Sequence, residues 1–147
     1  GPIVAFMLHN PSTAGAENND PTVNRGIGFA RRWGASRLVF VNPFAGRATK
    51  PADLWKMDDP VGPANMQYIV NLALAVTMSN GFFVFAWGAV NPPAALRHRV
   101  RTHLYEVEDS VRAYCRDLRC LGLTNTGYPR HPLYLRADTS LQSWNPP

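Results

Sequence analysis

The chain has 147 residues, 46% of them hydrophobic and 17% charged, which fits one domain with a single core and excludes a disordered chain. No apolar run reaches the ~20 residues of a membrane-spanning helix, so we expect no membrane partner and a cytoplasmic protein. The net charge is +5, and all 15 basic residues except Lys50 and Lys56 are arginines. Arginine suits an anionic partner such as DNA, although a GC-rich coding sequence also explains this bias.

The first predicted element is a buried strand over residues 3–8, a continuous apolar run that ends in a turn-rich loop. A helix is expected over 23–33, and Gly34 ends it. A second buried strand is expected over 37–41, and it stops at Asn42-Pro43. Both strands therefore run directly into polar loops.

The rest of the chain alternates in the same way. The further elements expected are a short helix or turn over 49–54, a helix over 65–79, a buried strand over 82–86, a helix in one or two pieces over 92–115, a short strand over 118–123 and a mostly irregular tail over 134–147. This alternation predicts a single domain over 1–147 with a three-layer α/β/α fold and a central, mainly parallel sheet of about four strands. Because a core strand rarely starts a natural chain, we expect a segment before Gly1.

Several chemistries have no support in the sequence. A glycine-rich phosphate loop, G-x-S-x-G and H-E-x-x-H are all missing, which argues against P-loop kinases, α/β-hydrolases and zincins. We expect neither a cofactor nor a metal, since His98 and His103 are not spaced as ligands on one helix face. Cys115 and Cys120 are expected to be reduced thiols, and their spacing also permits a redox pair. The basic stretch 97–103 predicts either a phosphate contact or, because acidic Glu106, Glu108 and Asp109 follow it, a solvated helix face.

The loop after the first strand is the first candidate site, because ligands of parallel sheets bind beyond the carboxyl ends of the strands. Asn10 can present a carboxamide, and Pro11 stiffens the loop. Ser12 and Thr13 can offer hydroxyl and backbone N–H groups to a phosphate. An ordinary turn closed by an Asx hydrogen bond is the alternative.

The loop over 127–134 is the second candidate site and the one for which the pattern most favours function. It combines two prolines with a guanidinium, an imidazole and two phenols, so it is stiff and chemically rich. His131 can donate a hydrogen bond to developing negative charge, and Arg130, Leu133 and Tyr134 are candidate substrate contacts. The alternative is a proline-rich surface turn.

Six further residues are candidates. Trp87-Gly88 provides either a pocket wall or core packing. Asp20 either orients water or caps the following helix. Arg25 and Arg47 are candidate phosphate contacts or solvated arginines, and Asn42 repeats the Asn-Pro arrangement of the first loop.

Six segments together resemble a bacterial and phage family of uncharacterised function, over nearly the whole chain. The segments are 8–14, 20–23, 41–49, 59–65, 86–88 and 127–134. This resemblance implies no particular activity.

The order of the loops is also similar to that of the uracil-DNA glycosylase superfamily, especially its mismatch-specific branch. There a first strand ends in Asn-Pro, and a late strand precedes a loop with a His-Pro or Asn-Pro core. Asn10-Pro11 and His131-Pro132-Leu133 correspond to these two loops, and Trp87-Gly88 corresponds to a third landmark. The resemblance implies a uracil-DNA glycosylase-like fold.

This second resemblance also implies roles for individual residues. Asn10 positions the attacking water or the flipped base, His131 stabilises the departing base anion, and Leu133 or Tyr134 enters the duplex where the base leaves. The chain departs from the pattern, because positions 10–14 contain no aspartate and Leu133 stands where a small residue is usual. These departures predict inefficient excision of uracil, so a modified base, a slow enzyme and a binding-only protein all stay open.

The sequence therefore predicts a monomeric base-processing protein that binds a flipped base of DNA and cleaves its N-glycosidic bond. The alternatives are a non-catalytic module that binds nucleic acid or a nucleotide, and a hydrolase of free nucleotides.

Overall fold

The structure is a computed structural model that describes residues 1–9, 21–44 and 63–144, and in these ranges it contains five strands and three α-helices. In chain order the elements are β1 (Ile3–Met7), α1 (Pro21–Arg32), β2 (Arg37–Val41), α3 (Pro63–Met78), β3 (Phe82–Phe85), the 3-10 helix η1 (Ala94–Leu96), α4 (Arg97–Tyr114), β4 (Leu118–Cys120), the 3-10 helix η2 (Pro132–Tyr134) and β5 (Gln142–Ser143). The helix or turn predicted over 49–54 lies outside the described residues.

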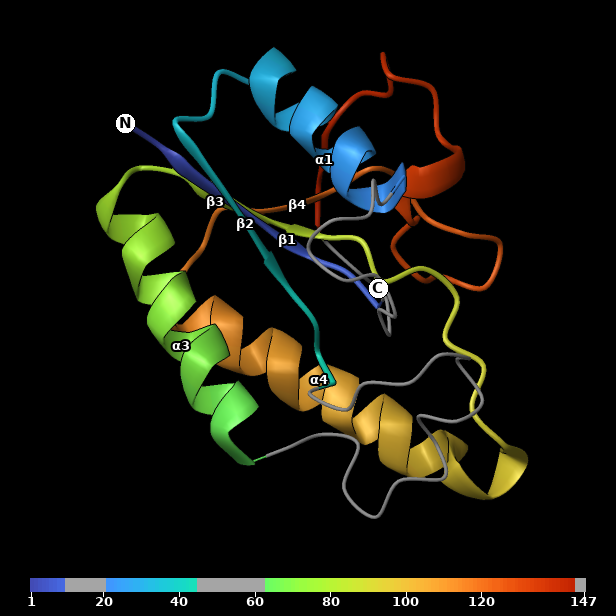
Figure 1. The fold of residues 1–147 in the computed structure, drawn as a ribbon. Helices are drawn as coiled ribbons and strands as arrows, with labels where there is room; N and C mark the ends of the chain where they lie inside the picture. Colours follow the sequence, from blue (N-terminus) through green and yellow to red (C-terminus); the bar gives the residue numbers. More distant parts are fainter. Residues whose placement is uncertain (10–20, 45–62, 145–147) are drawn as a thin grey trace.

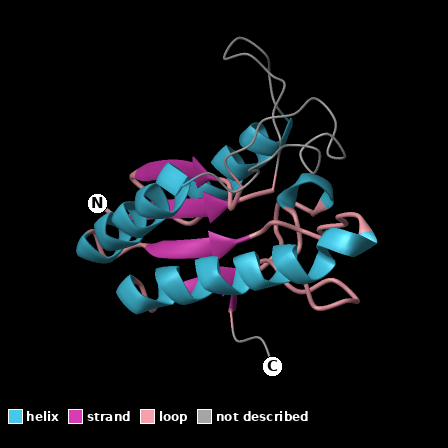
Figure 2. Ribbon diagram, turned by 90° about the horizontal axis from the view of Figure 1, so that it is seen from below, coloured by secondary structure: helices cyan, strands magenta, loops and turns pink. Residues whose placement is uncertain are grey.

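The sheet has the order β2-β1-β3-β4-β5. The first four strands are parallel, and β5 runs antiparallel to β4. Figure 2 shows the parallel strands pointing toward the same end of the molecule. The chain leaves β1 to one side to form β2 and crosses to the other side to form β3. The switch point of this sheet therefore lies between the ends of β1 and β3.

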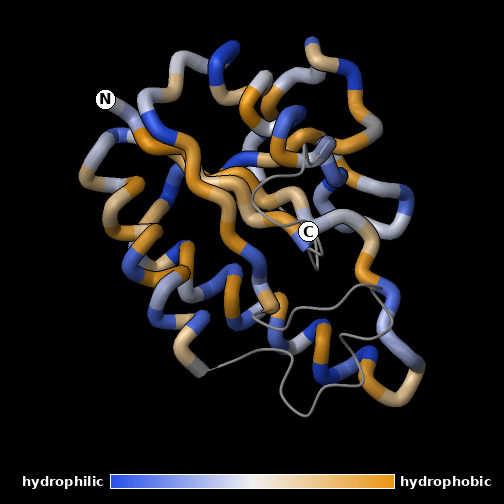
Figure 3. Tube along the Cα trace, viewed as in Figure 1, coloured by the Kyte–Doolittle hydropathy of each residue, from blue (hydrophilic) through white to orange (hydrophobic). Residues whose placement is uncertain are grey.

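Helices cover both faces of the sheet, as the sequence predicts. Figure 1 shows α1 on one side of the strands and α3 with α4 on the other. Alternate strand residues point to opposite faces: Ala5 and Phe83 pack toward α3 and α4, whereas Phe6 and Val84 pack toward α1. All four are buried, which explains the continuous apolar runs. The strands are accordingly the hydrophobic part of the tube in Figure 3.

Most predicted boundaries agree with the structure to within two residues, but α1 ends at Arg32 and does not include Trp33. Gly34 has φ +73, a left-handed conformation that favours glycine, and it turns the chain out of the helix. Trp33 still packs on the apolar face, with its ring 5.3 Å from that of Phe29 and 5.6 Å from that of Phe6.

Two sequence predictions about strands need correction. Residues 37–41 do form β2, but this strand lies at the edge of the sheet, so its residues are mostly only partly buried. The tail predicted to be irregular supplies a fifth strand, β5, and its Trp144 is 4% exposed. The Trp144 indole nitrogen donates to Glu108 Oε1 at 2.8 Å, which ties the tail to α4.

The basic stretch on α4 and the acidic residues after it are not a uniformly solvated surface. Arg97, Arg99 and Arg101 are exposed, but His103 is buried, with Nε2 2.7 Å from Pro43 O. Glu108 is also buried and receives hydrogen bonds from Trp144 and Arg112. In the described helices we find no segment both long and apolar enough to cross a membrane.

Candidate functional site

Three polar side chains lie near the switch point of the sheet, two of them at the ends of β1 and β2 and the third beside Gly88, which follows β3. His9 follows β1, Asn42 follows β2, and the Asn42 side chain hydrogen-bonds His9. His131 lies close enough to His9 for its charge to affect the titration of His9. We call His9, Asn42 and His131 the switch-point cluster. Asn42 and His131 are both among the site residues that the sequence predicts.

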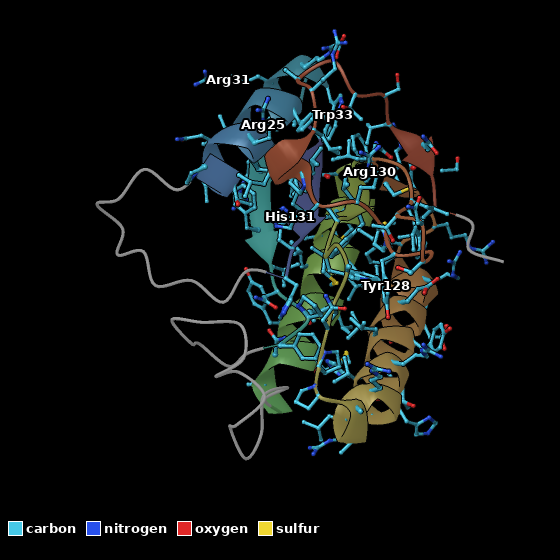
Figure 4. The ribbon with its side chains drawn as sticks, turned by 90° about the vertical axis from the view of Figure 1, so that its right-hand side faces the viewer. Arg25, Arg31, Trp33, Tyr128, Arg130 and His131 are labelled. Atoms are coloured by element: carbon cyan, nitrogen blue, oxygen red, sulfur yellow. The ribbon has the colours of Figure 1, made fainter. Side chains whose placement is uncertain are left out.

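The loop that carries His131 is fixed to the end of β3. Gly88 N–H donates to Pro129 O at 2.8 Å, and Arg130 N–H donates to Gly122 O at 2.9 Å. An isolated antiparallel bridge between Leu123 and Pro129 closes the loop into a hairpin. Because both ends of the hairpin are held by backbone hydrogen bonds, His131 has a defined position over the sheet edge (Figure 4).

The His131 ring is oriented by its own helix. His131 precedes η2, and its Nδ1 accepts a hydrogen bond from Leu133 N–H at 3.2 Å. In a neutral imidazole with Nδ1 as acceptor, the proton is on Nε2. His131 therefore offers Nε2–H as a donor, the chemistry that stabilises a developing anion.

Gly88 allows His131 to approach the end of β3. It has φ +71, and a Cβ built on it would lie 3.1 Å from the Cβ of His131. The hydrogen atom of glycine avoids both the strain of the left-handed backbone and this close contact. The predicted site residue Gly88 thus acts by positioning His131.

Gly88→Ala is expected to lower stability by about 1–2 kcal/mol and also to displace His131. Ligand binding or turnover at the switch-point cluster should then fall more than the loss of folded protein explains. Urea unfolding together with a binding assay measures both effects. Gly34→Ala is the matched control, since Gly34 has φ +73 with nothing within 4 Å of a built Cβ. Equal functional losses in the two variants would argue against the positioning role of Gly88.

His9 is held in its neutral form. Burial is the main reason that its pKa falls from 6.5 to about 4, and the charge of His131, when protonated, lowers it further, while the hydrogen bond with Asn42 acts in the opposite direction. A buried neutral imidazole is a directional hydrogen-bonding group at neutral pH. His9 can therefore orient a neighbour without adding charge to the site.

Folding stability should consequently decrease as the pH falls from about 6.5 to about 4, because in this window the unfolded chain binds a proton that the folded chain excludes. The loss in the free energy of unfolding attributable to His9 is about 3 kcal/mol. It is complete below the pKa of His9 in the folded chain and absent above pH 7. Urea unfolding of wild type and His9→Gln across pH 4 to 7.5 measures it. The difference between the two curves should change with pH, and parallel curves would contradict the assignment.

The structure does not bring every predicted site residue to this cluster. Trp87 is 4% exposed, and its side chain packs 5.0 Å from the Phe85 ring on the face covered by α3 and α4. Arg25 lines a separate cavity of about 270 Å³ on α1. Arg130 is exposed on the hairpin, and Tyr134 is the last residue of η2. Asn10, Pro11, Ser12, Thr13, Asp20 and Arg47 lie outside the described residues.

Sequence reasoning missed His9 as a member of the site. Its signal was present, because His9 is the first polar residue after the buried strand. The electrostatic effect of His131, 122 positions away in the chain, on His9 could not be predicted before the fold was known. No three His, Cys, Asp or Glu residues within the described ranges are placed to hold a metal ion. Cys115 and Cys120 are free and buried, and burial raises the pKa of both thiols.

The fold and the switch-point cluster define an α/β protein with polar groups at the carboxyl ends of a parallel sheet, where such proteins bind ligands. The chain belongs to the family described as Protein of unknown function (DUF1643), whose model matches residues 1–133. The match includes every residue of the switch-point cluster. No curated protein and no solved structure matches the chain. The resemblance to uracil-DNA glycosylases therefore stays a prediction.

Proposed function

We propose that this protein binds a nucleobase flipped out of DNA at the switch-point cluster and cleaves its N-glycosidic bond. The observation that carries the proposal is the fixed orientation of His131, whose Nδ1 accepts from Leu133 N–H, as in the neutral tautomer that carries its proton on Nε2. Because the donor is already oriented, little free energy is spent on reorienting it when a base leaves as an anion.

In the proposed reaction the bond between the sugar C1′ and the base nitrogen breaks, and its electron pair stays on the base. The Nε2–H of His131 stabilises the resulting anion, and a water oxygen bonds to C1′. The water proton goes to the base or to solvent, so the products are an abasic site and a neutral base. Asn10, which the sequence analysis assigns to the water, follows His9 directly.

The arginine content of the chain supports an anionic polymer as the substrate. Extruding a base costs a few kcal/mol, which phosphate contacts and a fitted site can offset. Arg25 lies near the start of α1, and Arg130 directly precedes His131 on the hairpin (Figure 4). They are the first candidates among the described residues for these contacts.

The test is to incubate the protein with duplex and single-stranded DNA that contains uracil, 5-hydroxymethyluracil or other modified bases, and then to measure abasic sites. Release of at least one base above the spontaneous rate supports the proposal. Inactivity across the panel with salt-dependent DNA binding would instead indicate a non-catalytic binding module. Hydrolysis of free nucleotides with indifference to DNA would indicate a small-molecule enzyme.

A further inference from the structure

A second concave site lies beside α4, on the other side of the Trp87-Gly88 dipeptide from His131. Two adjoining cavities, of about 420 Å³ and about 260 Å³, share Arg101, Leu104, Thr126 and Tyr128 in their walls. The larger has the volume of an ordinary small-molecule site, which is about 300–1,000 Å³. We call the two cavities together the α4 groove.

The groove is basic at one end and acidic at the other. Arg97 and Arg101 line the smaller cavity, and Asp109 lines the larger one. Arg97, Arg101, Tyr105 and Glu108 follow one another at near-helical spacing, so they share one face of α4 over about 16 Å. Glu108 is buried and its Oε1 already accepts from Trp144 and Arg112, whereas Asp109 is exposed and is the more accessible acidic group for a ligand.

Aromatic rings form the walls between these two ends. Tyr128, Tyr105, Trp87 and Trp144 all line the larger cavity, and Figure 4 shows Tyr128 beside α4. Trp87 supplies a second, independent feature, because its Nε1 is buried without a hydrogen-bond partner in the described part of the chain. Buried donors are normally satisfied, so the unpaired Nε1 of a residue that lines the cavity calls for an explanation.

We infer that the α4 groove binds a nucleotide, with its phosphate at Arg97 and Arg101 and its base against Tyr128. Arginine forks recognise phosphate, and aromatic rings stack on bases. Asp109 can accept a hydrogen bond from an exocyclic amine, so adenine, cytosine and guanine are favoured over thymine. This inference deepens the proposed function, since Gly88 contacts His131 while the adjacent Trp87 lines the groove. The groove nucleotide would then neighbour the flipped one.

The test is calorimetric titration of the full chain with dAMP, dTMP, deoxyadenosine, inorganic phosphate and a short single-stranded oligonucleotide. We expect dAMP to bind at least about fivefold more tightly than dTMP, deoxyadenosine or phosphate alone. Tighter binding of the oligonucleotide than of dAMP would place the groove nucleotide within a strand. The reverse order would indicate a free nucleotide as the ligand.

Variants of the groove residues test whether dAMP binds in the α4 groove. Arg101→Ala and Tyr128→Ala should each weaken dAMP about tenfold, and Tyr128→Phe should retain most of the affinity, because the ring still stacks. Arg99→Ala is the matched control, being an exposed arginine of the same helix that lines neither cavity. Unchanged melting temperatures would show that each variant is folded.

The His131→Ala variant separates this inference from the proposed function. It should bind dAMP as wild type does, even though base release is lost. Loss of dAMP binding in His131→Ala, retention in both groove variants, or no binding of dAMP and the oligonucleotide at all would each overturn the inference. Base release by a protein that fails this titration would leave the proposed function standing alone.

Discussion

Replacing His131 by alanine is expected to lower the rate of base release about 100- to 1,000-fold on whichever modified base proves to be the substrate. This is the effect of removing one preorganised donor from a site that stabilises an anion. The donor is preorganised because Leu133 N–H occupies the other ring nitrogen of His131 at 3.2 Å. Single-turnover measurement of abasic sites reports the chemical step directly.

Two companion variants test whether the loss of rate is due to the N–H donor of His131. His131→Gln retains a side-chain N–H donor and should recover part of the rate, whereas a purely steric role would not be rescued in this way. His98→Ala removes an exposed histidine at the start of α4 and should behave as wild type. Full activity in His131→Ala would exclude the proposed mechanism, even if the protein does release bases.

The layered fold could be predicted because its strands have an unambiguous signal. Residues 82–85 are four consecutive apolar residues with 9% exposure or less, as a strand covered on both faces requires. β5 had no comparable signal, because it is only two residues long and both are exposed. β5 forms because a hydrogen bond to Glu108 holds the neighbouring Trp144 in place. The sequence predicts that Glu108 belongs to a solvated acidic stretch.

The candidate site could be predicted only in part, because the direction and burial of its side chains depend on the folded chain. The rule that ligands bind beyond the carboxyl ends of parallel strands pointed to Asn42 and His131 as site residues, since it depends on topology alone. It could not say which way each side chain turns. Trp87 and Gly88 are neighbours in sequence, yet Gly88 contacts His131 while Trp87 packs on the other side against Phe85. The depressed pKa of His9 likewise arises from burial that only the folded chain provides.

Trp144→Ala is expected to destabilise the protein by about 3–5 kcal/mol, the usual cost of removing a buried aromatic side chain. Trp144 is 4% exposed, and its ring lies 5.6 Å from that of Phe85 and 5.9 Å from that of Trp87. The substitution also removes one of the donors to Glu108, a buried carboxylate. Urea unfolding at neutral pH gives the difference.

Trp144→Phe separates packing from hydrogen bonding, because it keeps most of the ring and loses the indole N–H. It should cost about 1–3 kcal/mol, the penalty for leaving one oxygen of Glu108 without this donor. Glu108→Gln tests the same bond from the other side, and its cost in the Trp144→Phe background should be smaller than in wild type, since paired groups are not additive. Independent costs would mean that the 2.8 Å contact does not hold the tail to α4. In that case β5 would depend on the packing of Trp144 alone.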